Sequence, residues 1–325
     1  MSDSITEIAP RLFRIDTPLG GRVVSIYLVV GDDRALMFDS GVAGTIPEYV
    51  LPALESVSIA PLSIETIVLS HCDIDHFGGI SDARQSLPAA RILAHPADRP
   101  AMEDFEVFLR ERGQGFAEPY GLTEGDDVVE WMRGLTGAGP LDGDIFDKDR
   151  IDLGGIEVVV WHVPGHTHGH TAIEVPHASA ILVADAVLGS SVNLADGTPA
   201  FPPTYRYVDT YRQTIARLAA ASHDLLLTSH YPTMHGDQAA AFLADSAAFV
   251  DRLEALVISE LRSATTGLTL QDLLSALNPI AGEWPTNGTE GALAYPVAGH
   301  LEDLAARAVI SRTGMAGNRP LWAIA

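Results

Sequence analysis

The sequence is poor in cysteine and in basic residues, and both shortages exclude classes of protein. Cys72 is the only cysteine among 325 residues. An intramolecular disulfide is therefore impossible, and a disulfide-rich secreted fold is excluded. Lysine and arginine together number 20 against 43 acidic residues, which gives a formal net charge of −23. Because polyphosphate ligands need cationic partners, this balance argues against binding of nucleic acid.

Long apolar runs are also missing. No stretch approaches the 18 consecutive apolar residues that indicate a membrane span, so we expect no membrane association. Residues 1–10 are polar and acidic and lack a basic segment followed by an apolar one, which favours a cytoplasmic protein. Core-forming residues are plentiful, since 47% of the chain is hydrophobic. Length and composition together fit one large domain with an appendage, or two domains.

Short β-rich runs separated by Gly and Asp turns fill the first 95 residues and return after residue 155. Apolar positions at helical spacing over 46–57 predict a crossover helix between strands. Segment 101–152 is acidic and glycine-rich, and we interpret it as an inserted lid or a solvated flap. Two strand-rich halves separated by an insertion predict two sheets packed face to face, with helices outside. The expected strands are 11–15, 23–30, 34–38, 66–69, 91–94, 156–163, 171–175, 180–184 and 225–228, and a helix is expected near 211–221.

The pattern changes to helices after residue 235. Thr269 and Asp272 have the spacing of a capping box at the start of a helix. Three helices and a terminal hairpin predict a winged-helix-like module over 236–325, behind a catalytic domain over 1–235. The expected elements are a helix with an apolar stripe over 249–261, one beginning at Thr269, one over about 297–308, and strands at 309–312 and 321–324.

The strongest local signal is the segment Ser-His-Cys-Asp-Ile-Asp-His-Phe-Gly-Gly at 70–79, directly after the apolar run 67–69. Four side chains able to bind metal lie within six positions on the loop that leaves a buried strand, where functional groups are commonly presented. They are His71, Asp73, Asp75 and His76. Loop capping is the structural alternative, and it is disfavoured because imidazoles and carboxylates are costly to bury unpaired.

Three later apolar strands also end in a side chain of the metal-ligand type, namely His166, Asp185 and His230. Each signal alone is weak, because a single histidine at a strand end is more often a hydrogen-bonded structural residue. Four such strand ends in one chain are typical of ligands that converge on a metal site.

Together these motifs resemble those of the metallo-β-lactamase superfamily across roughly residues 8–235. Asp39 in Phe-Asp-Ser-Gly matches the first motif, and the usual second motif, His-x-His-x-Asp-His, has Asp73 here in place of its second histidine. The resemblance implies a four-layer αββα sandwich and a metallohydrolase. It also implies two divalent metal ions, the first held by His71, Asp73 and His166, the second by Asp75, His76 and His230, with Asp185 bridging them.

The carboxylate of Asp73 affects the expected metal. It is a harder ligand than imidazole and shifts preference toward iron or manganese, although it does not dictate the metal, and zinc remains the first expectation. The expected reaction is hydrolysis by a metal-bridging hydroxide, because bound divalent ions lower the pKa of water and polarise a carbonyl. Asp75 is the candidate catalytic residue that orients the water and accepts its proton.

Several neighbouring residues receive supporting roles. We expect Asp39 to hydrogen-bond the ligand loops or a ligand imidazole, and we assign His168 and His170 to loop structure or to support of the ligands. Cys72 is interpreted as buried and inert rather than as a catalytic thiol. Three tyrosines are candidates to stabilise a developing oxyanion, and the sequence does not choose among Tyr205, Tyr207 and Tyr231.

The function expected first is hydrolysis of an ester, lactone or thioester in a small organic molecule. The alternative is a di-iron oxygenase or oxidase with the same ligands; a ribonuclease-like hydrolase and a non-catalytic metal-binding protein are less favoured. A winged helix by itself would suggest DNA binding, but residues 236–325 have scattered arginines and no lysine. We therefore expect this module to cover the active site or to form a subunit contact, which leaves a homo-oligomer open.

Overall fold

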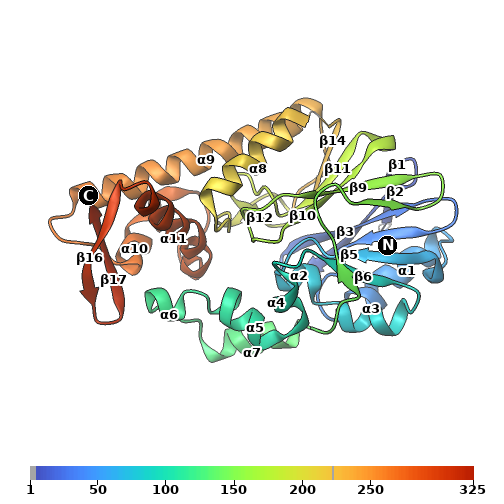
Figure 1. Ribbon diagram of the computed structural model, residues 1–325, viewed down its shortest axis with the longest axis horizontal. Helices are drawn as coiled ribbons and strands as arrows, with labels where there is room; N and C mark the ends of the chain where they lie inside the picture. The colour runs from blue at the N-terminus through green and yellow to red at the C-terminus, as the bar shows by residue number, and fades with distance from the viewer. Residues whose placement is uncertain (1–4, 222) are drawn as a thin grey trace.

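Two β-sheets lie face to face in the computed structural model, which describes residues 5–221 and 223–325 (Figure 1). The first sheet has the strand order β1-β2-β3-β4-β5-β6-β7, and the second has the order β15-β14-β11-β10-β9-β8. The strands of the first sheet are β1 (Ile5–Ala9), β2 (Leu12–Leu19), β3 (Arg22–Val30), β4 (Ala35–Phe38), β5 (Ile64–Val68), β6 (Arg91–Ala94) and β7 (Gly143–Asp144). Those of the second are β8 (Arg150–Asp152), β9 (Glu157–His162), β10 (Thr171–Val175), β11 (Ala180–Ala184), β14 (Leu225–Thr228) and β15 (Met234–His235).

The inner strands of both sheets are apolar on both faces. β4, β5 and β6 run parallel to one another, as do β11 and β14, and every residue of β4, β11 and β14 is buried. Parallel strands covered on both sides read as continuous apolar runs, which is the pattern of these segments. Between the sheets, Leu36 and Val68 of the first share an apolar cluster with Val160 and Leu182 of the second. Removal of this surface from water stabilises the sandwich.

Helices cover the outer faces of the two sheets. Val50 and Leu54 pack with Met37 in the apolar cluster outside the first sheet, and Leu218 packs with Ile181 outside the second. The fold is therefore the predicted four-layer αββα sandwich. The helices of the sandwich are η1 (Ile46–Val50), α1 (Leu51–Ser56), η2 (Pro61–Ser63), α2 (Ile74–Phe77), α3 (Ile80–Ser86), α4 (Arg99–Glu103), η4 (Pro176–Ala178) and α8 (Val208–Ala221).

Segment 101–152 divides into two parts. Its first part forms short helices that lie between the first sheet and the C-terminal helices (Figure 1). Its last ten residues, predicted as part of the lid, instead supply β7 to the first sheet and β8 to the second. Strands of two and three residues are too short to show a periodic pattern, which is why the sequence did not indicate them. The helices are α5 (Phe105–Phe108), η3 (Leu109–Gly113), α6 (Ala117–Tyr120) and α7 (Asp126–Gly134).

The C-terminal region has the predicted order of three helices and a hairpin. Thr269 caps its helix together with Asp272, as the sequence predicted. Val257 and Leu301 of this region share one apolar cluster with Val187 of the sandwich, so the region packs directly on it. A division at 235/236 remains our proposal. The elements are α9 (Gly236–Ser263), α10 (Leu270–Ala281), α11 (Glu290–Ala306), β16 (Ile310–Ala316) and β17 (Arg319–Ile324), and a small hairpin of β12 (Val192–Asn193) and β13 (Pro199–Phe201) precedes α8.

None of the helices that the structure describes combines the length and the apolarity needed to cross a membrane.

Candidate metal centre

The seven predicted ligands come together at one edge of the sandwich. Each follows the carboxyl end of a strand: four follow β5, one lies between β9 and β10, one follows β11 and one follows β14. Because parallel strands direct their carboxyl ends toward the same edge, side chains far apart in sequence meet there. The ligand atoms form three groups, and within each group all the atoms lie within 4.8 Å of one another. They are His71, His76 and Asp185; His71, Asp73 and His166; and Asp75, His76 and His230.

The backbone is unusual at two places where it aims these side chains. Asp39 has a φ of +70°, and Ala184, directly before the ligand Asp185, has a φ of +45°. The register between β11 and β14 also shifts at Ala184. Left-handed conformations are unfavourable for residues other than glycine and persist where the surrounding structure enforces them. These two residues mark where regular pairing ends and the site begins.

Asp39 sets the orientation of two imidazoles. Its Oδ2 accepts a hydrogen bond from His76 Nδ1 at 2.8 Å and from Ser70 Oγ at 2.9 Å, and Ser70 Oγ in turn lies 2.9 Å from His71 Nδ1. An ionised carboxylate only accepts, and the Ser70 hydroxyl donates its one proton to Asp39, so in the neutral form of each ring the proton lies on Nδ1 and the lone pair on Nε2. Those two Nε2 atoms are buried and have no hydrogen-bond partner among the described residues. This is the arrangement of imidazoles that are ready to bind a metal.

His230 is oriented in the same way from the other sheet. Its Nδ1 donates to the carbonyl oxygen of Val23 at 2.9 Å, which leaves the lone pair on Nε2. That atom lies 3.1 Å from Asp185 Oδ2 and 3.6 Å from Asp75 Oδ2. The Oδ1 atom of Asp185 is buried and has no partner within the described part of the chain.

The spacing of the second ligand set fits a metal ion. Ligand atoms about 2.0–2.2 Å from one tetrahedral ion lie roughly 3.3–3.6 Å from one another. His76 Nε2 lies 3.8 Å from Asp75 Oδ1 and 3.7 Å from Asp185 Oδ2, and His230 Nε2 lies 3.6 Å from Asp75 Oδ2. These separations are too long for hydrogen bonds and close to those of atoms that share a cation.

The electrostatics of this set also favour a cation. Burial lowers the pKa of His76, but the carboxylates of Asp75, Asp39 and Asp185 outweigh burial and raise it to about 10. Burial opposes ionisation of Asp185, yet His230 and His76 hold its pKa well below the ordinary value. A proton on His76 and a divalent ion therefore compete for the same negative environment.

The first ligand set has an additional member that the sequence did not reveal. Arg112, on η3, donates from Nε to Asp73 Oδ1 at 2.6 Å and from Nη2 to Asp73 Oδ2 at 2.8 Å. The same Nη2 lies 3.1 Å from His166 Nε2. Burial disfavours the Asp73 carboxylate, but Arg112 outweighs it and holds the pKa of Asp73 well below its usual value. Arg112 lies 39 positions from Asp73, within an acidic segment. The only hint of it in the sequence is Asp73 itself, an additional carboxylate in the ligand motif that needs a positively charged partner.

The remaining predicted residues have structural contacts. His170 donates from Nε2 to the carbonyl oxygen of Val183 and stacks on His71, with ring centroids 4.4 Å apart. His168 stacks on Tyr207 instead of facing the ligands. Burial raises the pKa of the Cys72 thiol well above its usual value, which fits an inert cysteine.

None of the three candidate tyrosines lines the pocket over the ligands. The Tyr205 hydroxyl contacts His300 Nε2 at 2.8 Å, Tyr231 donates to main-chain carbonyl groups, and Tyr207 stacks as described. The tyrosine that does line the pocket is Tyr295 on α11, which the sequence did not single out.

A pocket of about 470 Å³ lies over the ligands Asp73, Asp75, Asp185 and His230. Three regions form its walls. The first consists of β2, β3 and the β12–β13 hairpin, the second is the helical segment 105–134, and the third is the start of α11. The apolar wall residues include Leu19, Phe108, Leu122, Val128, Trp131, Met132 and Phe201, and the charged ones include Arg22, Glu124 and Glu290. The segment predicted as a lid and the C-terminal region therefore both border the space over the ligands.

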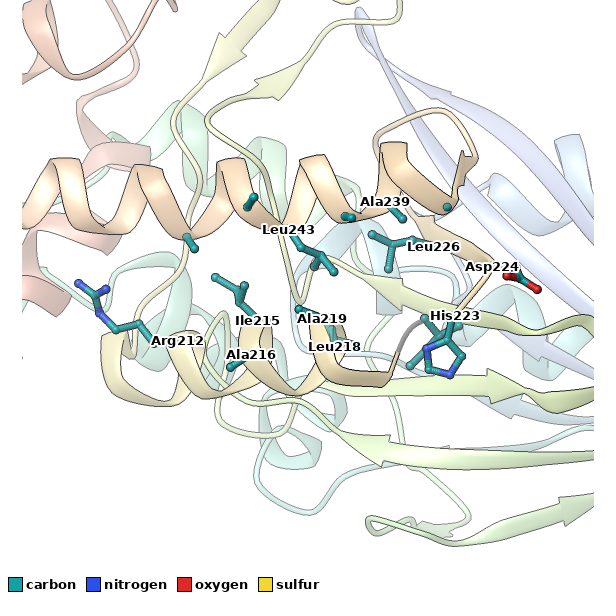
Figure 2. Close-up of a pocket in the computed structure, with 15 residues that line it drawn as sticks. Arg212, Ile215, Ala216, Leu218, Ala219, His223, Asp224, Leu226, Ala239 and Leu243 are labelled. Carbon is teal, nitrogen blue, oxygen red and sulfur yellow. The ribbon is translucent and has the colours of Figure 1, made fainter.

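A second pocket, of about 640 Å³, lies between α8 and α9 (Figure 2). Ile215, Leu218 and Leu243 line its middle, and Arg212 lies at the opposite end from His223. It contains none of the predicted ligands, and Arg212 is already paired with Asp251. The pocket over the ligands is therefore the candidate substrate site.

Comparisons with known proteins establish the family. The profile of the metallo-β-lactamase superfamily matches residues 19–230, more than half of the chain, and the chain belongs to that family. It is 28% identical over 204 residues to a hydroxyacylglutathione hydrolase of Aeromonas salmonicida, covering 62% of this chain and 58% of that protein. It is 31% identical over 143 residues to a hydroxyacylglutathione hydrolase of Ruegeria pomeroyi, covering 43% of this chain and 52% of that protein. The chain thus spans little more than half the length of these curated relatives.

Among solved structures, a metallo-β-lactamase family protein from Thermus thermophilus is similar over the whole chain. The TM-score is 0.76 at 18% identity, and the match covers 98% of this chain and 100% of that one. At this identity the likeness shows the fold alone. It includes the C-terminal helical region, which is thus a shared part of the architecture.

Proposed function

We propose that this protein is a metal-dependent hydrolase that cleaves an ester, lactone or thioester bond in a small organic molecule. The observation that carries the proposal is the convergence of oriented imidazoles and carboxylates beneath a pocket with a largely apolar wall. Relatives named for hydrolysis of hydroxyacylglutathione support the thioester as the first substrate to test. A cytoplasmic location and a role without nucleic acid remain part of the proposal.

The ligand set would hold two divalent ions, with Asp185 between the two groups. When bound, such ions lower the pKa of a coordinated water and polarise a carbonyl oxygen. Zinc is the first metal to test, because three oriented imidazoles, His71, His76 and His230, present nitrogen lone pairs to the centre. Asp39 holds two of these rings in place, and its removal would free them to rotate.

Asp75 is the proposed catalytic base. It lies on α2 and borders the pocket while remaining largely buried. Asp75 Oδ2 lies 3.6 Å from His230 Nε2, and Asp75 Oδ1 lies 3.8 Å from His76 Nε2. One oxygen of the carboxylate could therefore bind a metal ion while the other accepts a proton from water.

The pocket wall suits the acyl part of a substrate. Leu19, Phe108 and Trp131 offer apolar contact, and Arg22 supplies a cation above the Phe201 ring at 4.9 Å. An apolar acyl chain would pack on the wall, and a carboxylate on the substrate would pair with Arg22.

A di-iron oxygenase or oxidase is the second candidate, because Asp73 adds a hard carboxylate to the ligand set. Its pairing with Arg112 weakens this argument, since that carboxylate is already neutralised within the protein.

The test is a substrate panel. Purified protein loaded with zinc, iron or manganese is assayed with a thioester, a lactone and an aryl ester of the same acyl group. We expect turnover of at least one class, loss of it with a chelator, and recovery on return of the metal. Absence of turnover with every metal and every bond type would contradict the proposal.

A further inference from the structure

Arg112 is placed where a cation of the first ligand set would lie. Its Nη2 is 2.8 Å from Asp73 Oδ2 and 3.1 Å from His166 Nε2, so one guanidinium nitrogen contacts two of the three first-set ligands. Asp73 Oδ2 and His166 Nε2 are 2.9 Å apart, which is hydrogen-bond contact and shorter than the roughly 3.3–3.6 Å between two ligand atoms of one tetrahedral ion. In the second set three of the four separations are 3.6 to 3.8 Å, and the fourth, between His230 Nε2 and Asp185 Oδ2, is 3.1 Å. In the first set His71 Nε2, which Arg112 does not contact, lies 3.6 Å from Asp73 Oδ2.

The position of Arg112 is fixed by several contacts. Both Asp73 oxygens accept from it in the two-pronged geometry that is specific to guanidinium and carboxylate. Its guanidinium carbon lies 4.2 Å from the centre of the Tyr295 ring, and the Tyr295 hydroxyl donates to its carbonyl oxygen at 2.8 Å. Only 7% of Arg112 is exposed. Separation of such a buried ion pair is strongly unfavourable, because each charge would be left without a partner.

We propose that Arg112 makes the two metal positions unequal by occupying the first one. This inference rests on the proposed function only in taking the same seven side chains as ligands. The second position, built by Asp75, His76 and His230, takes an ion directly. The first takes an ion only when Arg112 leaves Asp73, so its affinity is reduced by the cost of breaking the buried pair.

The same contacts connect the metal centre to two other regions. Arg112 belongs to the helices that border the pocket, and Tyr295 belongs to the C-terminal helix α11. Displacement of η3 would carry the guanidinium away from the first position, and displacement of α11 would remove the ring that packs against it. Filling of that position is therefore coupled to the pocket wall.

The experiment is a titration of chelator-stripped protein with zinc alone, followed by calorimetry and by competition with a chromophoric chelator. For the parent protein we expect two binding steps whose affinities differ by at least about 100-fold, the scale of breaking a buried ion pair. Arg112→Met should bring the two steps to within about tenfold of one another. Arg110→Met is the matched control, because Arg110 lies on the same short helix with its side chain exposed, and its titration should equal the parent's.

Arg112→Lys protects the test against a variant that fails to fold. An ammonium group keeps the charge but cannot span both carboxylate oxygens, so the gap between the two steps should narrow without closing. Two equal steps in the parent, or an unchanged gap in both Arg112 variants, would overturn the proposal. Because zinc binding is measured without substrate, failure of the hydrolase proposal would leave this result unaffected.

Discussion

The two halves of the site, which are the first and the second ligand set, balance the negative charge of their buried carboxylates in different ways. In the second half, Asp75 lies 3.6 Å and 3.8 Å from two imidazoles, at distances suited to a shared metal ion, and Asp185 lies 3.7 Å from His76 and 3.1 Å from His230. In the first half, Asp73 is neutralised by the protein's own guanidinium at hydrogen-bond distance. A buried carboxylate needs a positive partner, and the partner can be a metal ion or a side chain. The presence of a ligand motif therefore does not fix how many metal ions it holds.

Substitution of a predicted ligand should produce the largest effect. Asp185→Ala and His230→Ala are expected to lose metal and at least about 1000-fold in activity, because the second half then lacks the oxygen or nitrogen that positions its ion. Elemental analysis and circular dichroism would separate metal loss from unfolding. His177→Ala is the control, since this exposed histidine contacts the Pro10 carbonyl far from the ligands. Two retained ions in Asp185→Ala would argue against a bridging role.

A double-mutant cycle at Asp73 and Arg112 would measure how strongly these two side chains of the first ligand set interact. Asp73→His alone leaves the buried guanidinium without its carboxylate and should cost about 3–5 kcal/mol of stability. Addition of Arg112→Met to Asp73→His should recover much of this loss and create a first position made of imidazoles, with preference moved toward zinc. Chemical denaturation and competitive loading with zinc, iron and manganese would measure both effects. Additive stability changes in the cycle would show that the two side chains do not interact.

The pocket wall should affect substrate binding more than metal content. Trp131 borders the pocket and is about half exposed, so it has surface available to a ligand. Trp131→Ala should raise KM about tenfold, which corresponds to loss of roughly 1–2 kcal/mol of apolar contact. Phe146→Ala is the control, because Phe146 is equally exposed and does not border the pocket. A loss of bound metal in Trp131→Ala would mean that 101–134 supports the ligands rather than the substrate.

The last effect concerns pH, where changes at the ligands must be separated from changes in the fold. Burial, together with the nearby charges of Arg212 and Arg307, lowers the pKa of His300 to about 3, although Glu254 lies 3.8 Å away. The unfolded chain takes up this proton near pH 6.5 and the folded chain does not, so stability is present above pH 6.5 and lost as pH falls toward 3.

One proton corresponds to at most about 1.4 kcal/mol per pH unit. Between pH 7.5 and pH 5 the parent should therefore lose about 2 kcal/mol more stability than His300→Gln, whose amide can still contact Tyr205. Urea unfolding of metal-free protein at both pH values measures the difference. Equal losses in the two proteins would show that His300 does not titrate on unfolding.

The sequence predicted the layers, and it predicted the side chains that converge at the candidate metal centre, because both depend on local pattern. Strands such as β11 and β14 are continuous apolar runs between turn residues, and a ligand follows shortly after each of them. The sequence did not predict β7 and β8, because strands of two or three residues are too short to show a periodic pattern of apolar residues. Arg112 and Tyr295 were missed because their roles arise from contacts between segments 39 and 183 positions apart, which no local pattern encodes.

One measurement tests most directly whether the ligand set supports metal-dependent hydrolysis. The rate of thioester cleavage is followed under nitrogen and in air, for protein stripped of metal and for the same protein reloaded with zinc. The account predicts no rate without metal, a restored rate with zinc, and equal rates under the two atmospheres. A rate that survives complete metal removal would contradict it, and so would product formation that requires both iron and oxygen.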